Sequence, residues 1–249
     1  MRLIMNLHGK HRGPAGPVEP ERTALILIDV INDMDSPDLS RGFLDAAGIA
    51  ARQIRELKRR AKAAGIPTIY ANDNFGNWRA EFSDVIAHCT RPGVPGKPIS
   101  ELLLPQEDDY FVLKPRHSGF FGTALELLLQ HMKKDTLILA GFAGDICVLF
   151  TAHDAYMREY DLFVPRDCVA SSEPAANEQA LRFMSDVAKA DTRASNAFEL
   201  PETPNPRAAP PQQFEVLNER DAQAAAPDAA SLCGEEDPGA ALEYLKDRS

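Results

Sequence analysis

Cysteine is scarce in this sequence, and no cysteine pair has the spacing of a zinc ligand set. The four cysteines, Cys89, Cys147, Cys168 and Cys233, are far apart in 249 residues, and none belongs to a Cys-x-x-Cys motif. Zinc sites need clustered ligands and small disulfide scaffolds need dense cysteines, so the spacing indicates neither class. The simplest interpretation is a protein with free thiols in a reducing compartment.

Long apolar runs are also missing. No segment reaches the roughly 18 consecutive apolar residues that a membrane-spanning helix requires. The first 22 residues contain no continuous apolar stretch of the length that a signal peptide needs. We therefore expect a cytoplasmic protein that has no membrane partner.

Positive charge is in deficit. Lysine and arginine total 27 residues against 37 aspartates and glutamates, which gives a formal net charge of -10 and a pI near 5.1. Such a negative field repels nucleic acids and anionic membrane surfaces, so neither is an expected partner. A small neutral or polar organic molecule is the better candidate for a ligand or substrate.

Composition divides the chain into three parts. Residues 1–21 contain several glycines and prolines and are expected to form an irregular lead-in. Residues 22–200 carry the patterns of a folded domain. Residues 201–249 are rich in proline, alanine and acidic residues and poor in large apolar side chains. This last part is expected to be mostly disordered, because it cannot bury enough surface to offset the entropy of ordering.

Short apolar runs alternate with segments of helical periodicity between residues 22 and 200. Strands are predicted at 23–30, 66–73, 110–114, 136–141 and 162–165, and helices at 40–64, 124–132, 146–158 and 173–187. Gly65 is expected to end the first helix as a C-cap. The alternation predicts an α/β fold with a doubly wound, mainly parallel sheet and helices on both faces.

Three polar residues lie where predicted strands end. In a doubly wound sheet, ligands bind beyond the carboxyl ends of the strands, which draws attention to Asp29, Lys114 and Cys147. Each has a plain explanation alone: Asp29 as a turn cap, Lys114 as a loop lysine, and Cys147 as a small buried residue. Together, however, a thiol, a carboxylate and an ammonium at one sheet edge form a nucleophilic site.

The chemistry of such a site depends on proton transfer from the thiol. A thiol attacks as the thiolate, and a helix N-terminus with a nearby ammonium is expected to lower the pKa of Cys147. The carboxylate of Asp29 can take the thiol proton and later deliver it to a leaving group. The turn "GFAGD" before Cys147 contains two glycines, so its backbone N–H groups can point inward and form an oxyanion hole.

These residues lie in three stretches that resemble the signatures of a known family. "ALILIDVINDM", "FVLKPRHSGFFGT" and "GFAGDICVLFTAHDAYMREYDLFVPRDCVA" are similar to those of the isochorismatase-like cysteine hydrolases. That superfamily includes nicotinamidases, N-carbamoylsarcosine amidase, ureidoacrylate amidohydrolases and isochorismatases. The resemblance covers about residues 22–200. It implies a Rossmann-like three-layer fold, with Cys147 as nucleophile, Asp29 as general acid and base, and Lys114 as the cation that stabilises the thiolate.

The resemblance also implies features of the turn and of assembly. A cis peptide bond is expected at Phe142–Ala143, and it would aim the N–H groups of Ala143 and Cys147 at the oxyanion. The family usually has threonine where this chain has Gly144, so a bracing hydroxyl is missing and a looser turn is expected. Family members commonly form dimers or tetramers, which implies a homodimer or homotetramer here.

The segment after the second predicted strand departs from the metal-binding relatives. Nicotinamidases carry an Asp-x-His motif and a further histidine there, whereas this chain has "YANDNFGNWRAEF" without histidine. Asp73 alone is a poor metal site. We therefore expect no catalytic metal and no other cofactor, and nicotinamidase activity is disfavoured.

Six residues near the predicted active edge are candidates for substrate contact. They are Asn72, Asn74, Trp78, His117, Phe120 and Phe121. The asparagines could hydrogen-bond an amide or carboxylate, but turn formation explains them about equally well. Trp78 could close the pocket or pack against a helix, and His117 could contact substrate or make a structural hydrogen bond.

The predicted reaction is hydrolysis of a C–N bond in a small amide, carbamoyl or ureido compound. An isochorismatase-type cleavage of a vinyl ether is the alternative, because protonation by Asp29 suffices for it. A non-catalytic binding or scaffold protein that keeps the fold is a further alternative.

Overall fold

The computed structural model describes residues 17–36 and 41–201. Most of the predicted lead-in (1–21) and nearly all of the predicted tail (201–249) lie outside these residues. The expectations of an irregular lead-in and a disordered tail therefore stay predictions.

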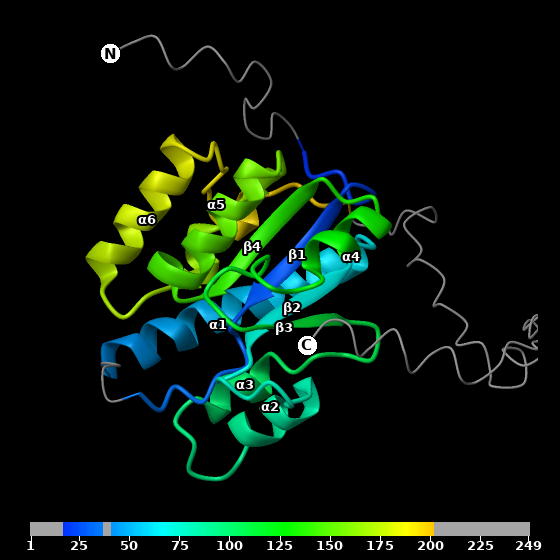
Figure 1. The fold of residues 1–249 in the computed structure, drawn as a ribbon. Helices are drawn as coiled ribbons and strands as arrows, with labels where there is room; N and C mark the ends of the chain where they lie inside the picture. The colour runs from blue at the N-terminus through cyan, green and yellow to red at the C-terminus, as the bar shows by residue number, and fades with distance from the viewer. Residues whose placement is uncertain (1–16, 37–40, 202–249) are drawn as a thin grey trace, which may run out of the picture. The chain divides into compact units, whose positions relative to one another are not determined.

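A parallel sheet forms the centre of the described domain (Figure 1). Its strands are β1 (Thr23–Ile28), β2 (Thr68–Asp73), β3 (Tyr110–Lys114), β4 (Thr136–Phe142), β5 (Asp161–Phe163) and β6 (Val169–Ala170). The order is β3-β2-β1-β4-β5, and β6 pairs with the carboxyl end of β4. β1 and β4 are buried along their whole length, which explains why both read as unbroken apolar runs.

Helices cover both faces of this sheet. They are α1 (Arg41–Ala63), α2 (Phe82–Cys89), α3 (Lys97–Leu102), α4 (Leu125–His131), α5 (Leu149–Met157) and α6 (Pro174–Asp186). α1, α2 and α3 share a hydrophobic core with Leu25 and Leu27 of β1, whereas α4, α5 and α6 pack with Ile26 and Ile28 from the other face of the same strand. The predicted doubly wound α/β fold is confirmed. None of the helices in the described ranges has the length and apolarity to cross a membrane.

The end of α1 shows how local sequence signals set the connections. Gly65 has φ of 75°, a conformation that glycine adopts at little cost. The Ile66 N–H donates to the Ala61 carbonyl at 2.9 Å and the Gly65 N–H to the Lys62 carbonyl at 3.0 Å. This pair of bonds is a Schellman motif, so the predicted C-cap is confirmed.

Strand order reverses between β1 and β4. From β1 the sheet continues to β2 and β3, and from β4 it continues to β5 and β6. Ligand sites of doubly wound folds lie at such a switch point, beyond the carboxyl ends of the strands. β1 and β4 approach closely there, because Gly141 faces Ile28 and a Cβ atom at Gly141 would collide with the Ile28 carbonyl.

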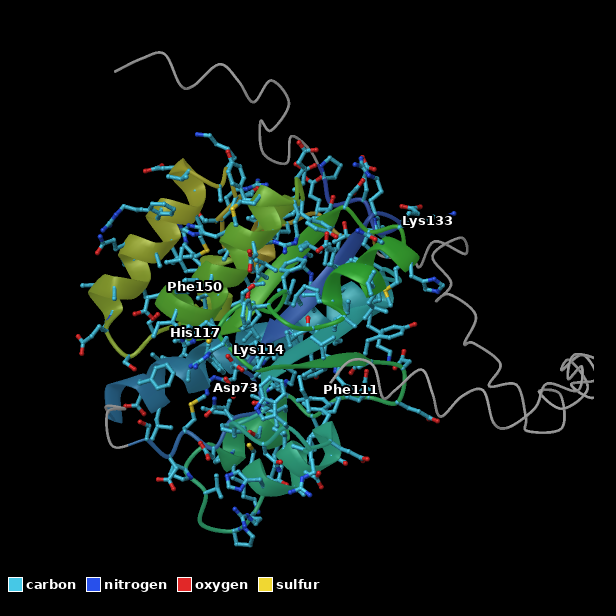
Figure 2. The ribbon with its side chains drawn as sticks, viewed as in Figure 1. Asp73, Phe111, Lys114, His117, Lys133 and Phe150 are labelled. Atoms are coloured by element: carbon cyan, nitrogen blue, oxygen red, sulfur yellow. The ribbon has the colours of Figure 1, made fainter. Side chains whose placement is uncertain are left out.

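A second pair of neighbouring strands ends at the same edge of the sheet. Asp73, the last residue of β2, is in register with Lys114, the last residue of β3. The two side chains are labelled close together in Figure 2. Four elements therefore bring their polar ends to one place: β1, β2, β3 and the turn that follows β4.

Residues 74–109 contain two short helices, α2 and α3, that are not among the predicted helices. α2 begins with a capping box between Glu81 and Asp84, and its buried residues Phe82, Val85 and Cys89 have helical spacing, so a signal for this helix was present and was missed. α3 is a six-residue helix with proline in its first turn, which is too short to show a helical period. The two-residue strand β6 is likewise too short to show a period.

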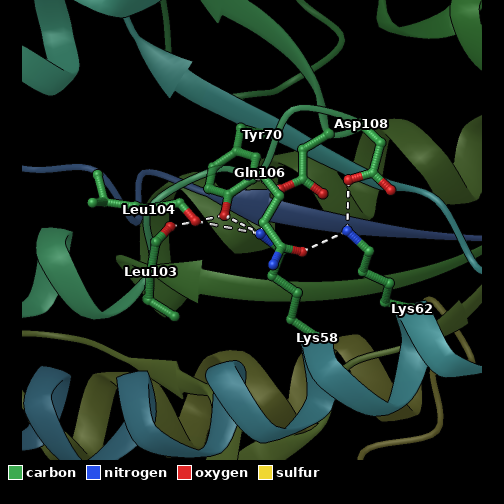
Figure 3. A network of polar contacts seen from close by, with 8 residues as sticks. Lys58, Lys62, Tyr70, Leu103, Leu104, Gln106 and Asp108 are labelled. Atoms are coloured by element: carbon green, nitrogen blue, oxygen red, sulfur yellow. Dashed lines mark hydrogen bonds and ion pairs between the residues drawn. The ribbon is translucent and has the colours of Figure 1, made fainter.

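A buried ion pair connects α1 to the segment before β3 (Figure 3). Lys58 donates to the Asp109 carboxylate at 2.5 Å and to the Tyr70 hydroxyl at 2.9 Å, and that hydroxyl donates to the Leu103 carbonyl at 2.8 Å. The side chains of Lys58 and Asp109 are only 9% and 4% exposed. Because both charges are buried, removal of either one leaves the other without compensation.

The Lys58→Met substitution is expected to lower the free energy of unfolding by about 3–5 kcal/mol, since the Asp109 carboxylate would stay buried and unpaired. Urea denaturation followed by far-ultraviolet circular dichroism measures this change. Arg59→Met is the matched control: it breaks the exposed Arg59–Glu56 pair on the same helix and is expected to leave stability nearly unchanged. Equal losses in both variants would contradict a special role for the buried pair.

Candidate active site

Asp29 directly follows β1, and its carboxylate is buried at the switch point. Its backbone has φ of 51°, a left-handed conformation that is uncommon outside glycine. The Asp29 N–H donates to the Ala71 carbonyl at 3.1 Å, and the carboxylate Oδ1 accepts the Asp73 N–H at 2.8 Å. These bonds to β2 hold the second oxygen, Oδ2, toward Lys114.

Lys114 is the last residue of β3 and is fully buried. Its Nζ lies 2.8 Å from Asp29 Oδ2, 3.7 Å from Asp73 Oδ2 and 3.6 Å from Cys147 Sγ. A buried ammonium needs compensation of this kind, because an isolated charge in the interior is very costly. The structure thus brings together all three residues that the sequence predicts as catalytic.

Cys147 lies in a π-helical turn, η1 (Gly144–Val148), which continues directly into α5. The Ala143 carbonyl accepts the N–H groups of Ile146 at 3.2 Å and Val148 at 3.1 Å, which winds the turn around one oxygen. Taken together, η1 and α5 form one helical segment that starts at Gly144, two residues before the start predicted at 146. The Phe142–Ala143 peptide bond is cis, as the family resemblance implies.

Burial controls the protonation of the site. Burial raises the pKa of Asp29 above its ordinary range, and the Lys114 ammonium offsets this only in part. Burial lowers the pKa of Lys114, but Asp29, Cys147 and Asp73 together outweigh it and raise that pKa. Lysine is therefore held in its charged form.

The pKa of the Cys147 thiol is raised to about 12, first by burial and then by the Asp29 carboxylate, while Lys114 acts in the opposite direction. The expectation of a lowered thiol pKa is therefore wrong. A helix N-terminus and one ammonium cannot stabilise a thiolate that is desolvated beside a carboxylate. Asp29 and Cys147 both contact the Lys114 ammonium, and the Asp29 carboxylate is near enough to raise the pKa of the thiol, so it is the candidate acceptor of the thiol proton.

Gly144 does not loosen the turn, contrary to the expectation from the missing threonine. A Cβ atom at Gly144 would overlap with Oδ1 of Asn177 and lie 2.5 Å from Cγ1 of Val169. Neighbouring side chains therefore fill the space that a larger residue would occupy, and Gly144 is buried. The turn is closely packed from the side of β6 and α6.

The sequence pattern of the Isochorismatase domain family matches residues 23–194, which is more than half of the chain. The chain belongs to the isochorismatase family. It is therefore an isochorismatase-family hydrolase whose fold and family agree with the resemblance seen in its motifs.

Individual relatives support this membership. The isochorismatase family protein YaaI of Bacillus subtilis (strain 168) is 40% identical over 164 residues, which cover 66% of this chain and 89% of that protein. The ureidoacrylate amidohydrolase RutB of Serratia proteamaculans (strain 568) is 31% identical over 188 residues, covering 65% of this chain and 75% of that protein. The crystal structure of N-carbamoylsarcosine amidase from Thermoplasma acidophilum superimposes with a TM-score of 0.56 at 27% identity, covering 72% of this chain and 99% of that one.

In this isochorismatase-family protein, the two asparagines predicted to contact substrate form hydrogen bonds with loop backbone. Asn72 is buried, and its amide nitrogen donates to the Ile31 carbonyl at 2.6 Å. Its Oδ1 has no hydrogen-bond partner among the described residues. The Oδ1 of Asn74 accepts the Gly76 N–H at 2.9 Å, which is turn chemistry. A contact of either side chain with substrate stays a prediction.

The aromatic candidates differ in exposure. Trp78 is 79% exposed. The His117 ring lies against Phe150 of α5 in a tilted arrangement, with ring centroids 5.6 Å apart (Figure 2), and Phe121 is exposed. Phe120 is buried, and its ring contacts Tyr160 and the guanidinium of Arg158. Their roles toward substrate are untested.

Asp73 joins the site, although the sequence indicated it only as a lone, poor metal ligand. Its carboxylate is about one-third exposed and lies beside the Lys114 ammonium. The sequence contained a signal for this placement, because Asp73 and Lys114 are the last residues of two consecutive predicted strands. Among residues 17–36 and 41–201, no group of three or more His, Cys, Asp or Glu side chains is arranged to hold a metal ion.

Asp29→Asn is expected to lower the pKa of Cys147, because the Asp29 carboxylate is one of the two causes that raise it. In the wild type, the rate of Cys147 alkylation by iodoacetamide should rise roughly tenfold per pH unit up to pH 10, since little thiolate is present. In Asp29→Asn the curve should level off at lower pH. Peptide mass spectrometry gives the rate for each cysteine.

Asp154→Asn is the control for that experiment. Like Asp29→Asn, it removes one negative charge, but the Asp154 carboxylate lies in α5 and pairs with Arg158 at the surface. Its alkylation curve should match the wild type. An unchanged curve in Asp29→Asn would show that Asp29 does not act on the thiol.

Gly144→Ala is expected to lower the free energy of unfolding by about 1–3 kcal/mol, because the added methyl group overpacks the site against Asn177 and Val169. Gly48→Ala in α1 should instead raise it by about 0.5–1 kcal/mol, since the nearest atom to a new Cβ there is 4.0 Å away. Urea unfolding distinguishes the two signs. A stabilising Gly144→Ala would mean that the turn has room.

Proposed function

We propose that this protein is a cysteine-dependent hydrolase that cleaves the C–N bond of a small amide, carbamoyl or ureido compound through a thioester. The observation that carries the proposal is the grouping of Asp29, Lys114 and Cys147 at the switch point. One ammonium lies within 2.8 Å of a carboxylate oxygen and 3.6 Å of a thiol sulfur. This group supplies a nucleophile, a proton acceptor and a fixed positive charge.

Attack begins from a neutral thiol. The raised pKa of Cys147 means that a free thiolate is scarce, so the proton moves to Asp29 as sulfur bonds to the substrate carbonyl. The Lys114 ammonium stabilises the negative charge that builds up on sulfur and on the substrate. By the family resemblance, the N–H groups of Ala143 and Cys147 bind the oxyanion.

Breakdown of the intermediate uses the same proton. Asp29 protonates the leaving amine, the C–N bond breaks, and a thioester remains on Cys147. A water molecule, deprotonated by Asp29, then attacks the thioester and releases the acid and the thiol. The raised pKa of Asp29 suits this alternation, because a raised pKa makes the carboxylate a better proton acceptor and burial is its main cause.

The names of two relatives support the C–N bond as the target. One is called ureidoacrylate amidohydrolase and the other N-carbamoylsarcosine amidase. Isochorismatase-type cleavage of a vinyl ether is the second candidate, favoured by the raised pKa of Asp29, which could act there as an acid without the cysteine.

The remaining expectations belong to this proposal. The partner is a small-molecule substrate, and neither nucleic acid nor membrane is involved. The reaction uses no metal and no cofactor, the protein acts in the cytoplasm, and it assembles as a homodimer or homotetramer.

Cys147→Ala is expected to reduce amide hydrolysis by at least about a thousandfold, because the thioester cannot form. The measurement is ammonia release from a panel of small amides, carbamoyl and ureido compounds. Cys168→Ala is the control, since Cys168 is also a buried free cysteine, but it lies in the turn Arg166–Cys168 before β6 and its thiol interacts with Asp167 and Ser195.

The outcomes separate the candidates. Loss of activity in both Cys147→Ala and Asp29→Asn supports thioester chemistry. Vinyl-ether cleavage that survives Cys147→Ala but not Asp29→Asn favours the isochorismatase reaction. Full amide hydrolysis in Cys147→Ala would overturn the proposal, and inactivity of the wild type toward both panels would favour a binding role.

A further inference from the structure

A short hydrogen-bond chain supports the turn that carries Cys147. The Asp145 N–H, two residues before the cysteine, donates to Ser171 Oγ at 3.0 Å. The Ser171 hydroxyl in turn donates to Asn177 Oδ1 at 2.9 Å. Ser171 is buried directly after β6, and Asn177 lies in the second turn of α6.

The same oxygen of Asn177 also fills the space beside Gly144. A Cβ atom at Gly144 would overlap with that oxygen and would lie 3.0 Å from Ser171 Oγ. The absence of a side chain at Gly144 is therefore what allows Asn177 and Ser171 to reach the turn. Side chains from β6 and α6 thus fill the space that a side chain at Gly144 would take.

The hydrogen bonds of Ser171 and Asn177 reach the turn on the side opposite to Asp29 and Lys114. β1, which leads to Asp29, pairs with one edge of β4, and β6, which leads to Ser171, pairs with the other edge. Cys147 thus meets Asp29 and Lys114 on one side of its turn, and the turn meets Ser171 and Asn177 on the other side.

We propose that Ser171 and Asn177 are positioning residues for Cys147 and for the oxyanion-binding N–H groups of its turn. This inference rests on the proposed function, in which Cys147 is the nucleophile. A shift of the turn by about 1 Å is enough to cost a factor of 100 in rate when reacting groups must be aligned. A hydrogen bond to the Asp145 N–H resists such a shift, because that N–H belongs to the same turn.

The plain alternative is that Ser171 and Asn177 only attach α6 to the domain. In that case their removal would lower stability but would leave the chemistry of the folded protein unchanged. A probe that reports on the oxyanion-binding groups separates the two roles. Propanal is such a probe: the Cys147 thiol adds across its carbonyl, a C–S bond forms, and the thiol proton ends on the former carbonyl oxygen.

The experiment measures how well propanal protects Cys147 from iodoacetamide, at a temperature where circular dichroism shows each variant folded. Asn177→Leu keeps the approximate volume but removes the acceptor for Ser171, whereas Asn177→Asp keeps an acceptor oxygen. Asn177→Leu is expected to weaken propanal binding at least about tenfold, with the alkylation rate without aldehyde within about threefold of wild type. Asn177→Asp should stay within about threefold in both measurements.

Ser171→Ala provides a second, smaller change if Asn177→Leu does not fold, and it is expected to weaken propanal binding in the same way. Wild-type propanal binding in folded Asn177→Leu or Ser171→Ala would overturn the positioning role while leaving the proposed function intact. Failure of wild-type Cys147 to bind propanal at all would instead overturn the nucleophile assignment, and the positioning role with it.

Discussion

The buried ammonium of Lys114 is the charge on which the arrangement of the site depends. Lys114 has no exposed surface, yet its pKa is raised, because two carboxylates and a thiol lie within 4 Å of its nitrogen. No single element supplies these groups: they come from the ends of β1 and β2 and from the turn after β4. The parallel register of the sheet therefore supplies the groups that compensate the buried Lys114 ammonium. The ammonium in turn attracts the ends of β1 and β2 and the turn after β4 to the end of β3.

This charge balance also sets the resting state of the nucleophile. One positive charge is shared between Asp29 and Asp73, so little of it is left to stabilise a thiolate on Cys147. The thiol accordingly stays protonated, because its pKa is raised. Such a site has a low concentration of free thiolate, which limits side reactions, and it couples deprotonation to the approach of a substrate carbonyl. In the proposed reaction, Asp29 carries the proton in both half-reactions.

Sequence reasoning succeeded where the signal was local or where strand ends coincide. The apolar runs of β1 and β4, the glycine at the end of α1 and the grouping of Asp29, Lys114 and Cys147 were all predictable. It failed for α3 and β6, because these elements are too short to show a period, and it missed α2 although Phe82, Val85 and Cys89 have helical spacing. It also failed for the direction of the Cys147 pKa shift, which depends on burial and on a neighbour 118 positions away in the chain.

The amino-acid sequence by itself predicted the fold class from its periodicity, the family from the resemblance of three motifs, and Asp29, Lys114 and Cys147 as candidate catalytic residues from their places at strand ends. Tertiary structure alone decided that Asp73 joins Lys114, that the thiol is protonated, and that side chains from β6 and α6 fill the space beside Gly144. The physical reason is the same in each case. Desolvation and steric fit are properties of neighbours in space, and these neighbours are distant in the chain.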